Sequence, residues 1–397
     1  MIEAAPRPAT ATGERRVDWL DALRGWAITG VVLVHASIDV PNLGQPWHSI
    51  AFIGQYGVQL FFVISALTVF HTYERELARG RGWARASLAW LVKRAFRIAP
   101  LYYFGIALYL ALFAAMRARG SLIPFASTAD VLANMTFVHT WVPSAQNKVV
   151  PGGWSIGVEM MFYLAVPFLD SRLRSPRACL VWFLLSATAA ELVDRLLAAS
   201  AGDGGVVTND SFLYFWLVTQ LPVFLAGLWL LRRESSHIWA GAAVEPGVAA
   251  AYAAFGVAMA AFGLWLGVVG QFDHVLAPAA MGMAFCGLVM GCRAPLLRPV
   301  LVNAVSVRIG RLSYSIYIVH FAFVLALRLI AKLTGLHDSL PGPALWLGSF
   351  VLSLAGATVV AAITYRLVEQ PGIELGRRLA ASIARRGVFA RMRYSEE

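Results

Sequence analysis

The feature that most constrains this fold is a series of apolar runs, most of them about 17–23 residues long. At about 1.5 Å of rise per residue, a helix of that length crosses the roughly 30 Å hydrocarbon core of a bilayer. Of the 397 residues, 59% are hydrophobic and 14% are charged, whereas soluble domains carry about 25% charged residues. The sequence therefore predicts an all-α integral membrane protein, with membrane lipids as its solvent.

Ten transmembrane helices are predicted on these runs, with edges placed to within several residues. They cover residues 18–40, 56–73, 97–116, 154–170, 178–198, 211–231, 247–269, 274–292, 312–333 and 344–366. A shorter apolar stretch at 128–143 is interpreted as a re-entrant or interfacial segment, which would need a cover of protein inside the membrane. The predicted domains are a disordered cytoplasmic N-terminus at 1–16, a transmembrane domain at 17–370 and a basic cytoplasmic tail at 371–397.

The placement of basic residues predicts the orientation of this bundle. If the N-terminus is inside, 27 of the 33 Lys and Arg residues fall on the cytoplasmic side and 6 on the outer side. Such a bias is typical of cytoplasmic loops, so both termini are predicted to be cytoplasmic, in a multi-pass protein of a bacterial inner membrane. The net charge of +11 is spread between the apolar runs and forms no single basic face, which argues against a nucleic-acid partner.

Ionisable groups inside hydrocarbon are costly and usually face a cavity or a partner, so they indicate where function lies. His35 follows Arg24 by eleven residues, which places it about 16 Å further along the first predicted span, in its outer half. Glu159 lies about 7–8 Å below the outer end of the fourth span, at a similar depth. A carboxylate beside an imidazole orients it and raises its basicity, as a general base requires. The alternative is a buried His–Glu pair that only joins helices.

Three arginines are predicted to share the cytoplasmic surface. Arg94 and Arg97 are three residues apart at the inner start of the third span, and Arg24 lies near the same interface, within pairing distance of Asp21. Guanidinium groups suit bidentate contacts to phosphate, so the cluster could bind a phosphorylated substrate. The alternative is ordinary positive flanking charge whose aliphatic stems lie in the membrane.

For other polar residues in the predicted spans, a packing role is at least as good an explanation as a catalytic one. A structural hydrogen bond of His320, near mid-membrane, is at least as good an explanation as catalysis, and Gly57 and Ser65 favour close helix approach. The three cysteines lie in apolar runs and are interpreted as buried small hydrophobes: Cys179, Cys286 and Cys292. The remaining histidines have no metal-ligand spacing, so neither a metal nor a resident cofactor is expected: His48, His71, His139, His237, His274 and His337.

Taken together, these segments resemble the acyltransferase-3 family of bacterial membrane proteins, from Leu20 to about Pro371. The resemblance rests on six patterns in the same order along the chain. They are Arg24 with His35, the run from Gly57 to Ser65, Arg94-x-x-Arg97, Trp154-Ser155-x-x-x-Glu159 with Phe162-Tyr163, Ser313-Tyr314-Ser315-x-Tyr317-x-x-His320, and Glu369 before Pro371. Each pattern is weak alone, but all six on a ten-span hydropathy profile are specific.

The resemblance implies that an acyl group, most simply acetyl, passes to surface glycans or related acceptors. It implies that His35 carries the transfer chemistry and that Arg24, Arg94 and Arg97 serve the cytoplasmic acyl-CoA side. Secondary site candidates are Asp21, Trp154, Ser155, Tyr163, Tyr314 and His320. Ala66 departs from the family, which usually has glycine there, and the methyl group touches no proposed chemical role. Some relatives carry a fused extracytoplasmic hydrolase-like domain, which this chain is expected to lack. The acceptor would then be bound by the membrane core, by its outer loops or by a separate extracytoplasmic partner.

The resulting hypothesis is an O-acyltransferase in which His35, oriented by Glu159, acts as base or nucleophile between acyl-CoA and a glycan or lipid-linked sugar. A transporter of a glycan precursor or small solute is the first alternative, because intramembrane His, Glu and Arg also form substrate paths. Transporters often show related halves, and no such repeat is visible here. A membrane scaffold is the second alternative, and it would tolerate loss of both His35 and Glu159.

Overall fold

The computed structural model describes residues 17–201, 212–239, 244–269, 275–295 and 297–393, so the predicted disordered segment 1–16 lies outside the described residues. The described part is built from helices joined by turns and loops. Its long helices are α1 (Asp18–His35), α3 (Gly57–Leu77), α4 (Trp83–Ala118), α6 (Trp154–Leu169), α7 (Pro176–Ala201), α8 (Leu217–Trp239), α9 (Pro246–Val269), α10 (Leu276–Gly291), α13 (Ser313–Leu333), α15 (Gly342–Thr364) and α16 (Gln370–Arg393). The shorter ones are α2 (Trp47–Ile53), α5 (Thr128–Met135), α11 (Arg298–Leu301), α12 (Ala304–Arg311) and α14 (Leu336–Ser339).

Five helical stretches in the described part are long and apolar enough to cross a membrane: Trp47–Leu77, Trp83–Ala118, Pro246–Gly267, Ser313–Leu333 and Gly342–Ala384. The apolar helices α6 and α10 are shorter, at 16 residues each. Helices α1, α7 and α8 reach 18 residues or more but carry more charge, for example Arg232 and Arg233 near the end of α8. The all-helical membrane fold is therefore confirmed, and the count of ten spans stays a prediction.

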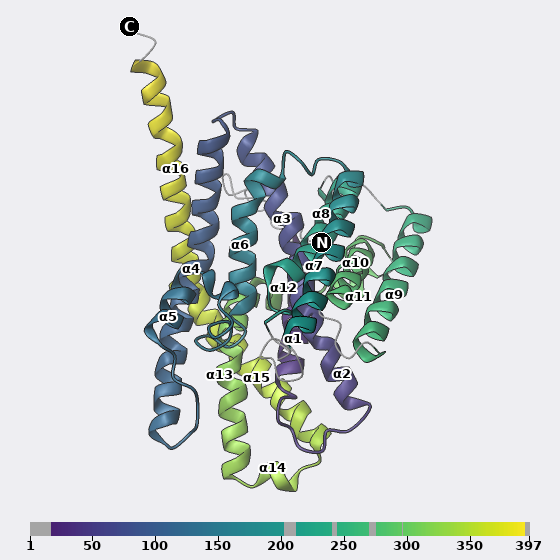
Figure 1. Ribbon diagram of the computed structural model, residues 1–397, viewed down its shortest axis with the longest axis vertical. Coiled ribbons are helices and arrows are strands. Elements are labelled where there is room, and N and C mark those ends of the chain that lie inside the picture. Colours follow the sequence, from purple (N-terminus) through teal and green to yellow (C-terminus); the bar gives the residue numbers. More distant parts are fainter. Residues whose placement is uncertain (1–16, 202–211, 240–243, 270–274, 296, 394–397) are drawn as a thin grey trace, which may run out of the picture.

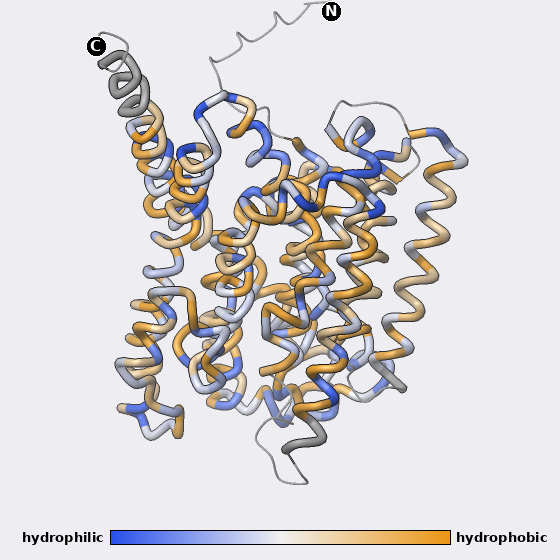
Figure 2. Tube along the Cα trace, turned by 45° about the horizontal axis from the view of Figure 1, so that its top comes forward, coloured by the Kyte–Doolittle hydropathy of each residue, from blue (hydrophilic) through white to orange (hydrophobic). Residues whose placement is uncertain are grey.

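Polar and apolar residues are distributed along the long axis as a membrane bundle requires. The α3–α4 turn and the C-terminal part of α16 lie at one end of the molecule, and α14 lies at the other (Figure 1). Hydrophilic residues gather towards the two ends and hydrophobic residues dominate the middle (Figure 2). This pattern matches a hydrocarbon layer bounded by two aqueous faces.

Helix α3 lies at the centre of the bundle and contacts α1, α4, α6, α8 and α10. Its buried face is closed by stacked aromatic rings: Phe62 and Phe224 have ring centroids 4.5 Å apart, and Phe162 and Phe224 3.9 Å apart. Such pairs contribute about 0.5–1.5 kcal/mol beyond the area they bury. A rigid α3 gives the polar residues along it fixed positions.

Glycine determines how closely two other helices approach α1. A Cβ on Gly310 of α12 would lie 1.6 Å from the carbonyl oxygen of Asp21, so the backbones of α1 and α12 touch there. A Cβ on Gly57 would lie 2.3 Å from the carbonyl oxygen of Ala27, which confirms the packing interpretation of Gly57. Ala66 is fully buried against Gly227 of α8, so its extra methyl group also serves packing.

The segment predicted to be re-entrant or interfacial, 128–143, folds into the helix α5 and a 3-10 turn, Val138–Trp141, against α4 and α6. Asp130 caps α5 with Ser127 and accepts a 2.9 Å hydrogen bond from Lys148. Burial would raise the pKa of Asp130, but the hydrogen bonds from Lys148 and Ser127 outweigh burial and hold that pKa below its usual range. The ion pair therefore fixes this loop beside the start of α6.

Among the helices that extend beyond their predicted spans, α4 and the continuous helix that begins with α15 do so by the most residues. Helix α4 begins at Trp83, whereas the predicted span began at 97, because its first turns are basic and escape a hydropathy criterion while still forming a helix. Helix α15 continues through a π-helical turn at Tyr365–Glu369 into α16, which packs along α4. The predicted basic tail from residue 371 thus begins as helix.

Candidate active site

Two cavities lie within the helical bundle, and they share a wall formed by Val58 of α3 and Tyr317 of α13. The first, here called the inner cavity, encloses about 730 Å³ including space open to solvent, and is lined by Arg24, Arg94, Arg97 and Glu159 among others. The second, the outer cavity, encloses about 1520 Å³ on the same basis and contains His35. The arrangement places cationic groups and an imidazole on opposite sides of one partition.

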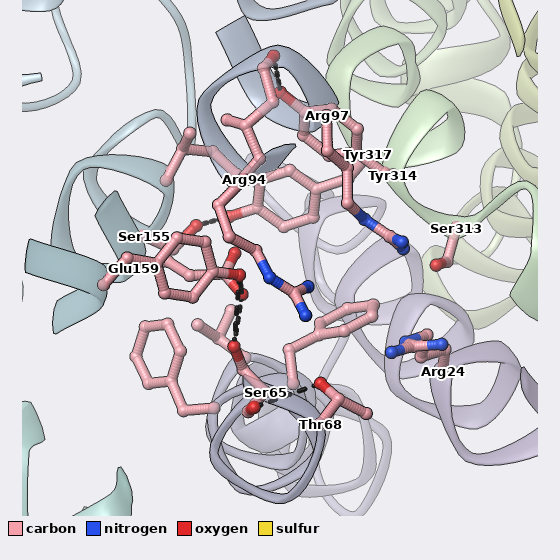
Figure 3. Close-up of a pocket in the computed structure, with 16 residues that line it drawn as sticks. Arg24, Ser65, Thr68, Arg94, Arg97, Ser155, Glu159, Ser313, Tyr314 and Tyr317 are labelled. Atoms are coloured by element: carbon pink, nitrogen blue, oxygen red, sulfur yellow. Dashed lines mark hydrogen bonds between the residues drawn. The ribbon is translucent and has the colours of Figure 1, made fainter. Parts of the chain in front are cut away.

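The inner cavity brings together the three predicted arginines. Arg24 enters from α1, and Arg94 and Arg97 enter from α4, with their guanidinium groups around one space (Figure 3). Arg94 donates to the hydroxyl of Thr72, and its guanidinium lies 5.4 Å from the ring centre of Trp90. Such contacts hold the planar group in place while leaving it charged.

Arg24 is positioned by a residue of its own helix, α1, which is held in turn by a residue of α12. Its Nη1 donates to Oδ1 of Asp21 at 3.3 Å, and the other oxygen of Asp21 accepts from Arg311 of α12 at 3.4 Å. Asp21, a predicted secondary residue, therefore lies outside the cavity and ties Arg24 to the close α1–α12 contact. The spacing of three residues on one helix face explains why the sequence predicted this pair.

Glu159 belongs to the inner cavity, beside the arginines. Its Oε1 accepts hydrogen bonds from the hydroxyls of Ser65 and Tyr163, both at 2.5 Å (Figure 3). Two donors on one carboxylate oxygen fix the direction of the side chain. Tyr163 also lies under Arg94, with the guanidinium carbon 5.9 Å from the ring centre, so the network joins α3, α4 and α6.

The sequence interpretation missed the polar face of α3. Ser65 was assigned to packing, and Thr68 and Thr72 were not singled out, yet Ser65 and Thr68 line the inner cavity and Thr72 holds Arg94. The three residues are spaced i, i+3 and i+7, so they lie on one helix face. A hydroxyl stripe on one face of an otherwise apolar span was the signal that could have identified them.

The predicted orientation of His35 by Glu159 is wrong. Glu159 bonds to Ser65 and Tyr163, whereas Nδ1 of His35 lies 2.9 Å from Nε2 of His320. The similar depth predicted for the two residues does not bring their side chains together, because they face different cavities. The partner of His35 is instead a residue for which the sequence favoured a structural hydrogen bond.

The hydrogen bonds of His320 assign the protons on both rings. Nδ1 of His320 lies 2.7 Å from the carbonyl oxygen of Tyr317, which can only accept, so this nitrogen carries the proton. In a neutral ring, Nε2 of His320 is then an acceptor, and Nδ1 of His35 must donate to it. Nε2 of His35 is left with a free lone pair.

The wall between the cavities is held by hydrogen bonds. The hydroxyl of Tyr317 donates to the carbonyl oxygen of Gly152 at 2.9 Å and lies 2.7 Å from Oγ of Ser155. Ser155 also lines the inner cavity, so a predicted secondary residue has a defined position there. The hydroxyl of Tyr314 donates to the carbonyl of Ile98 at 2.8 Å and ties α13 to α4.

Aromatic rings dominate the outer cavity. Trp154, at the start of α6, stacks on Phe215 with ring centres 4.5 Å apart, and both line the cavity. The ring of Phe321 lies 4.2 Å from that of His35. Tyr214, on the same wall, accepts a 3.0 Å hydrogen bond from Gln59, which is fully buried in α3.

Comparison with known proteins identifies the family to which this protein belongs. The family described as "Acyltransferase domain", acyltransferase-3, matches residues 17–362. The chain is also 22% identical over 402 aligned positions to "Acyltransferase MdmB" of Streptomyces mycarofaciens, an alignment that covers 93% of this chain and 95% of that protein. No solved structure matches. Because the family match spans nearly the whole chain, the protein belongs to the acyltransferase-3 family and is a membrane acyltransferase.

Proposed function

We propose that this enzyme transfers an acyl group, most simply acetyl, from acyl-CoA in the inner cavity to a hydroxyl of an extracytoplasmic glycan or lipid-linked sugar. The observation that carries the proposal is the shared wall. Val58 and Tyr317 separate a cavity containing three arginines from a cavity containing His35. If the acyl donor and the acceptor enter from opposite sides of the membrane, each needs its own cavity. The two cavities must then meet where the acyl group is transferred.

The inner cavity suits the phosphorylated donor. Coenzyme A carries phosphate groups, and guanidinium groups bind phosphate through paired hydrogen bonds. The three arginines lie in a partly enclosed space with reduced access to water, where each charge interaction is stronger than on an open surface. In this proposal the thioester-bearing arm reaches from the arginines along α3 to the partition at Tyr317.

His35 supplies the chemistry at the partition. As a base, its Nε2 takes the proton of the acceptor hydroxyl while that oxygen bonds to the thioester carbon. The carbon–sulfur bond then breaks, and the imidazolium returns the proton to the departing thiolate of coenzyme A. As a nucleophile, the same nitrogen first forms an acyl-imidazolium with release of the thiolate of coenzyme A. The acceptor hydroxyl then attacks the acyl carbon, the carbon–nitrogen bond breaks, and the hydroxyl proton neutralises the thiolate. Both routes use the lone pair that His320 leaves free.

The proposed topology has ten spans, both termini in the cytoplasm, and placement in a bacterial inner membrane. Single cysteines introduced as Leu122→Cys and Arg177→Cys test it, because both positions are exposed and lie in the proposed outer and inner segments. The native cysteines are buried and should react slowly with a membrane-impermeant maleimide. In intact cells with a permeable outer membrane, Leu122→Cys should be labelled and Arg177→Cys should not. The reverse pattern would overturn the topology.

The central experiment incubates the reconstituted protein with labelled acetyl-CoA and a cell-envelope extract, followed by analysis of labelled products. Wild-type protein should produce a labelled ester, and His35→Ala should lose transfer while remaining in the membrane. His337→Ala is the matched control, because His337 lies in α14 away from both cavities. Full transfer by His35→Ala would end the proposal. A transporter or scaffold would give no labelled product with either protein.

A further inference from the structure

The two cavities differ in charge. The inner cavity contains three arginines and one glutamate, whereas the described lining of the outer cavity contains no Asp, Glu, Lys or Arg. A chamber that suits an anionic donor therefore adjoins one whose described lining offers no ionic partner to a ligand. Bringing a charge into such surroundings is costly unless an opposite charge meets it.

The described lining of the outer cavity offers a limited set of side chains for hydrogen bonds to a ligand. The hydroxyl of Tyr214 already accepts a hydrogen bond from the side chain of Gln59, and the hydroxyl of Tyr317 donates one to the carbonyl oxygen of Gly152. Among the described lining residues, hydrogen-bonding capacity is offered by Nε2 of His35, by the side-chain amide of Gln55, and by Oδ1 of Asn147, which is buried and has no hydrogen-bond partner. Each buried hydroxyl that finds no partner weakens binding, so a ligand with a hydroxyl on every face fits poorly.

What the cavity does offer is apolar area and volume. Its walls carry the rings of Phe52, Trp154, Phe215 and Phe321 together with branched aliphatic side chains from α1. The part of it that a water-sized sphere can occupy, about 570 Å³, lies within the roughly 300–1,000 Å³ typical of small-ligand sites. A bulky apolar body is the ligand feature that such walls recognise.

We propose that the acceptor is a neutral amphipathic alcohol or glycoside whose bulky apolar part fills the outer cavity while one hydroxyl reaches Nε2 of His35. The inference rests on the proposed function and narrows its acceptor. Oδ1 of Asn147 accepts a second hydroxyl of the same polar end. Free polysaccharide chains and anionic sugars are excluded as good acceptors.

The test uses the full chain in phospholipid nanodiscs with labelled acetyl-CoA and a matched set of acceptors. Octyl β-glucoside, below its micelle concentration, and methyl β-glucoside present the same sugar hydroxyls with different apolar bodies. Octyl β-glucuronide adds a negative charge, and maltotetraose represents a free glycan. Each buried methylene contributes a factor of about four, so kcat/KM for the octyl glucoside should exceed that for the methyl glucoside by at least about 100-fold. The glucuronide should fall at least about tenfold below the octyl glucoside.

A cavity variant separates recognition by the protein from partition into lipid. Phe52→Glu introduces a carboxylate into the cavity wall and should reduce the octyl preference at least about tenfold. Phe125→Glu is the matched control, because Phe125 is an exposed loop residue outside both cavities. If partition alone caused the preference, both variants would retain it, and the inference would be overturned.

The remaining outcomes distinguish this inference from the proposed function. Equal transfer to maltotetraose and octyl glucoside overturns the inference and leaves the acyltransferase proposal standing. Hydrolysis of acetyl-CoA that depends on His35, without transfer to any glycoside, also counts against the inference. Neither transfer nor hydrolysis, with an envelope extract included as acceptor, contradicts the proposed function itself.

Discussion

Nδ1 of His35 lies 2.9 Å from Nε2 of His320, and the second ring nitrogen of His320 is bonded to the carbonyl oxygen of Tyr317. In this series of hydrogen bonds, His35 is the donor to His320, so the lone pair on Nε2 of His35 is available for catalysis. The imidazole is therefore oriented by a second imidazole and a backbone carbonyl. When Nε2 of His35 takes a proton, the cation is stabilised by the same acceptor on His320.

Loss of His320 should reduce kcat because His35 loses its orientation. We expect His320→Ala to lower kcat by about 10- to 100-fold with little change in KM for acyl-CoA. His320→Gln should recover part of the loss, because its amide oxygen can accept the hydrogen bond from Nδ1 of His35. Steady-state kinetics at several pH values provide the measurement.

The pH profile distinguishes orientation from folding. Wild-type transfer should fall on acidification, because protonated His35 can act neither as base nor as nucleophile. A role for His320 in folding alone would lower the amount of active enzyme but leave this profile and its kcat per active molecule unchanged.

Arg94 should control binding of the donor. We expect Arg94→Gln to raise KM for acyl-CoA by about 10- to 100-fold, because it removes the charge that Thr72, Trp90 and Tyr163 hold in the inner cavity. Arg94→Lys should recover little, because an ammonium group cannot form the paired contacts. Arg177→Gln makes the same charge change at an exposed site outside both cavities and should behave as wild type. An unchanged KM for Arg94→Gln would show that the donor binds elsewhere.

Tyr317 should keep the acyl group from water. Replacement by leucine removes the hydroxyl that bonds to Gly152 and Ser155, so the partition between the cavities is weakened. We expect Tyr317→Leu to raise the ratio of acyl-CoA hydrolysis to transfer by about tenfold, measured as free thiol against ester product. Tyr103→Leu is the control, because Tyr103 lies outside both cavities. An unchanged ratio would remove Tyr317 from this role.

The backbone contact between α1 and α12 should be intolerant of a methyl group. In Gly310→Ala, the new Cβ would meet the carbonyl oxygen of Asp21 at 1.6 Å, so the helices must separate. We expect a loss of about 1–3 kcal/mol in the free energy of unfolding, seen as a lower Tm in detergent. A Cβ at Gly348 of α15 meets nothing within 4 Å, so Gly348→Ala should not lower Tm. Equal Tm values for both variants would contradict the close contact.

The sequence by itself determined the helical membrane fold, because apolar runs of bilayer length leave the backbone no alternative in hydrocarbon. It also identified local pairs such as Asp21 with Arg24, since residues three apart on a helix are neighbours whatever the tertiary structure. The hydropathy criterion failed at the start of α4, where basic residues continue a helix beyond its apolar part. The gathering of Arg24 with Arg94 and Arg97 was predicted from their shared depth at one interface.

Only the tertiary structure decided which side chains meet across helices. Glu159 and His35 were predicted to lie at a similar depth but face different cavities. A predicted depth fixes position along the membrane normal and leaves rotation about each helix axis open. Rotation is set by packing, here by the close glycine contacts of α1 and the stacked rings around α3. That packing pairs His35 with His320, a contact between residues 285 positions apart that no periodicity in either helix encodes.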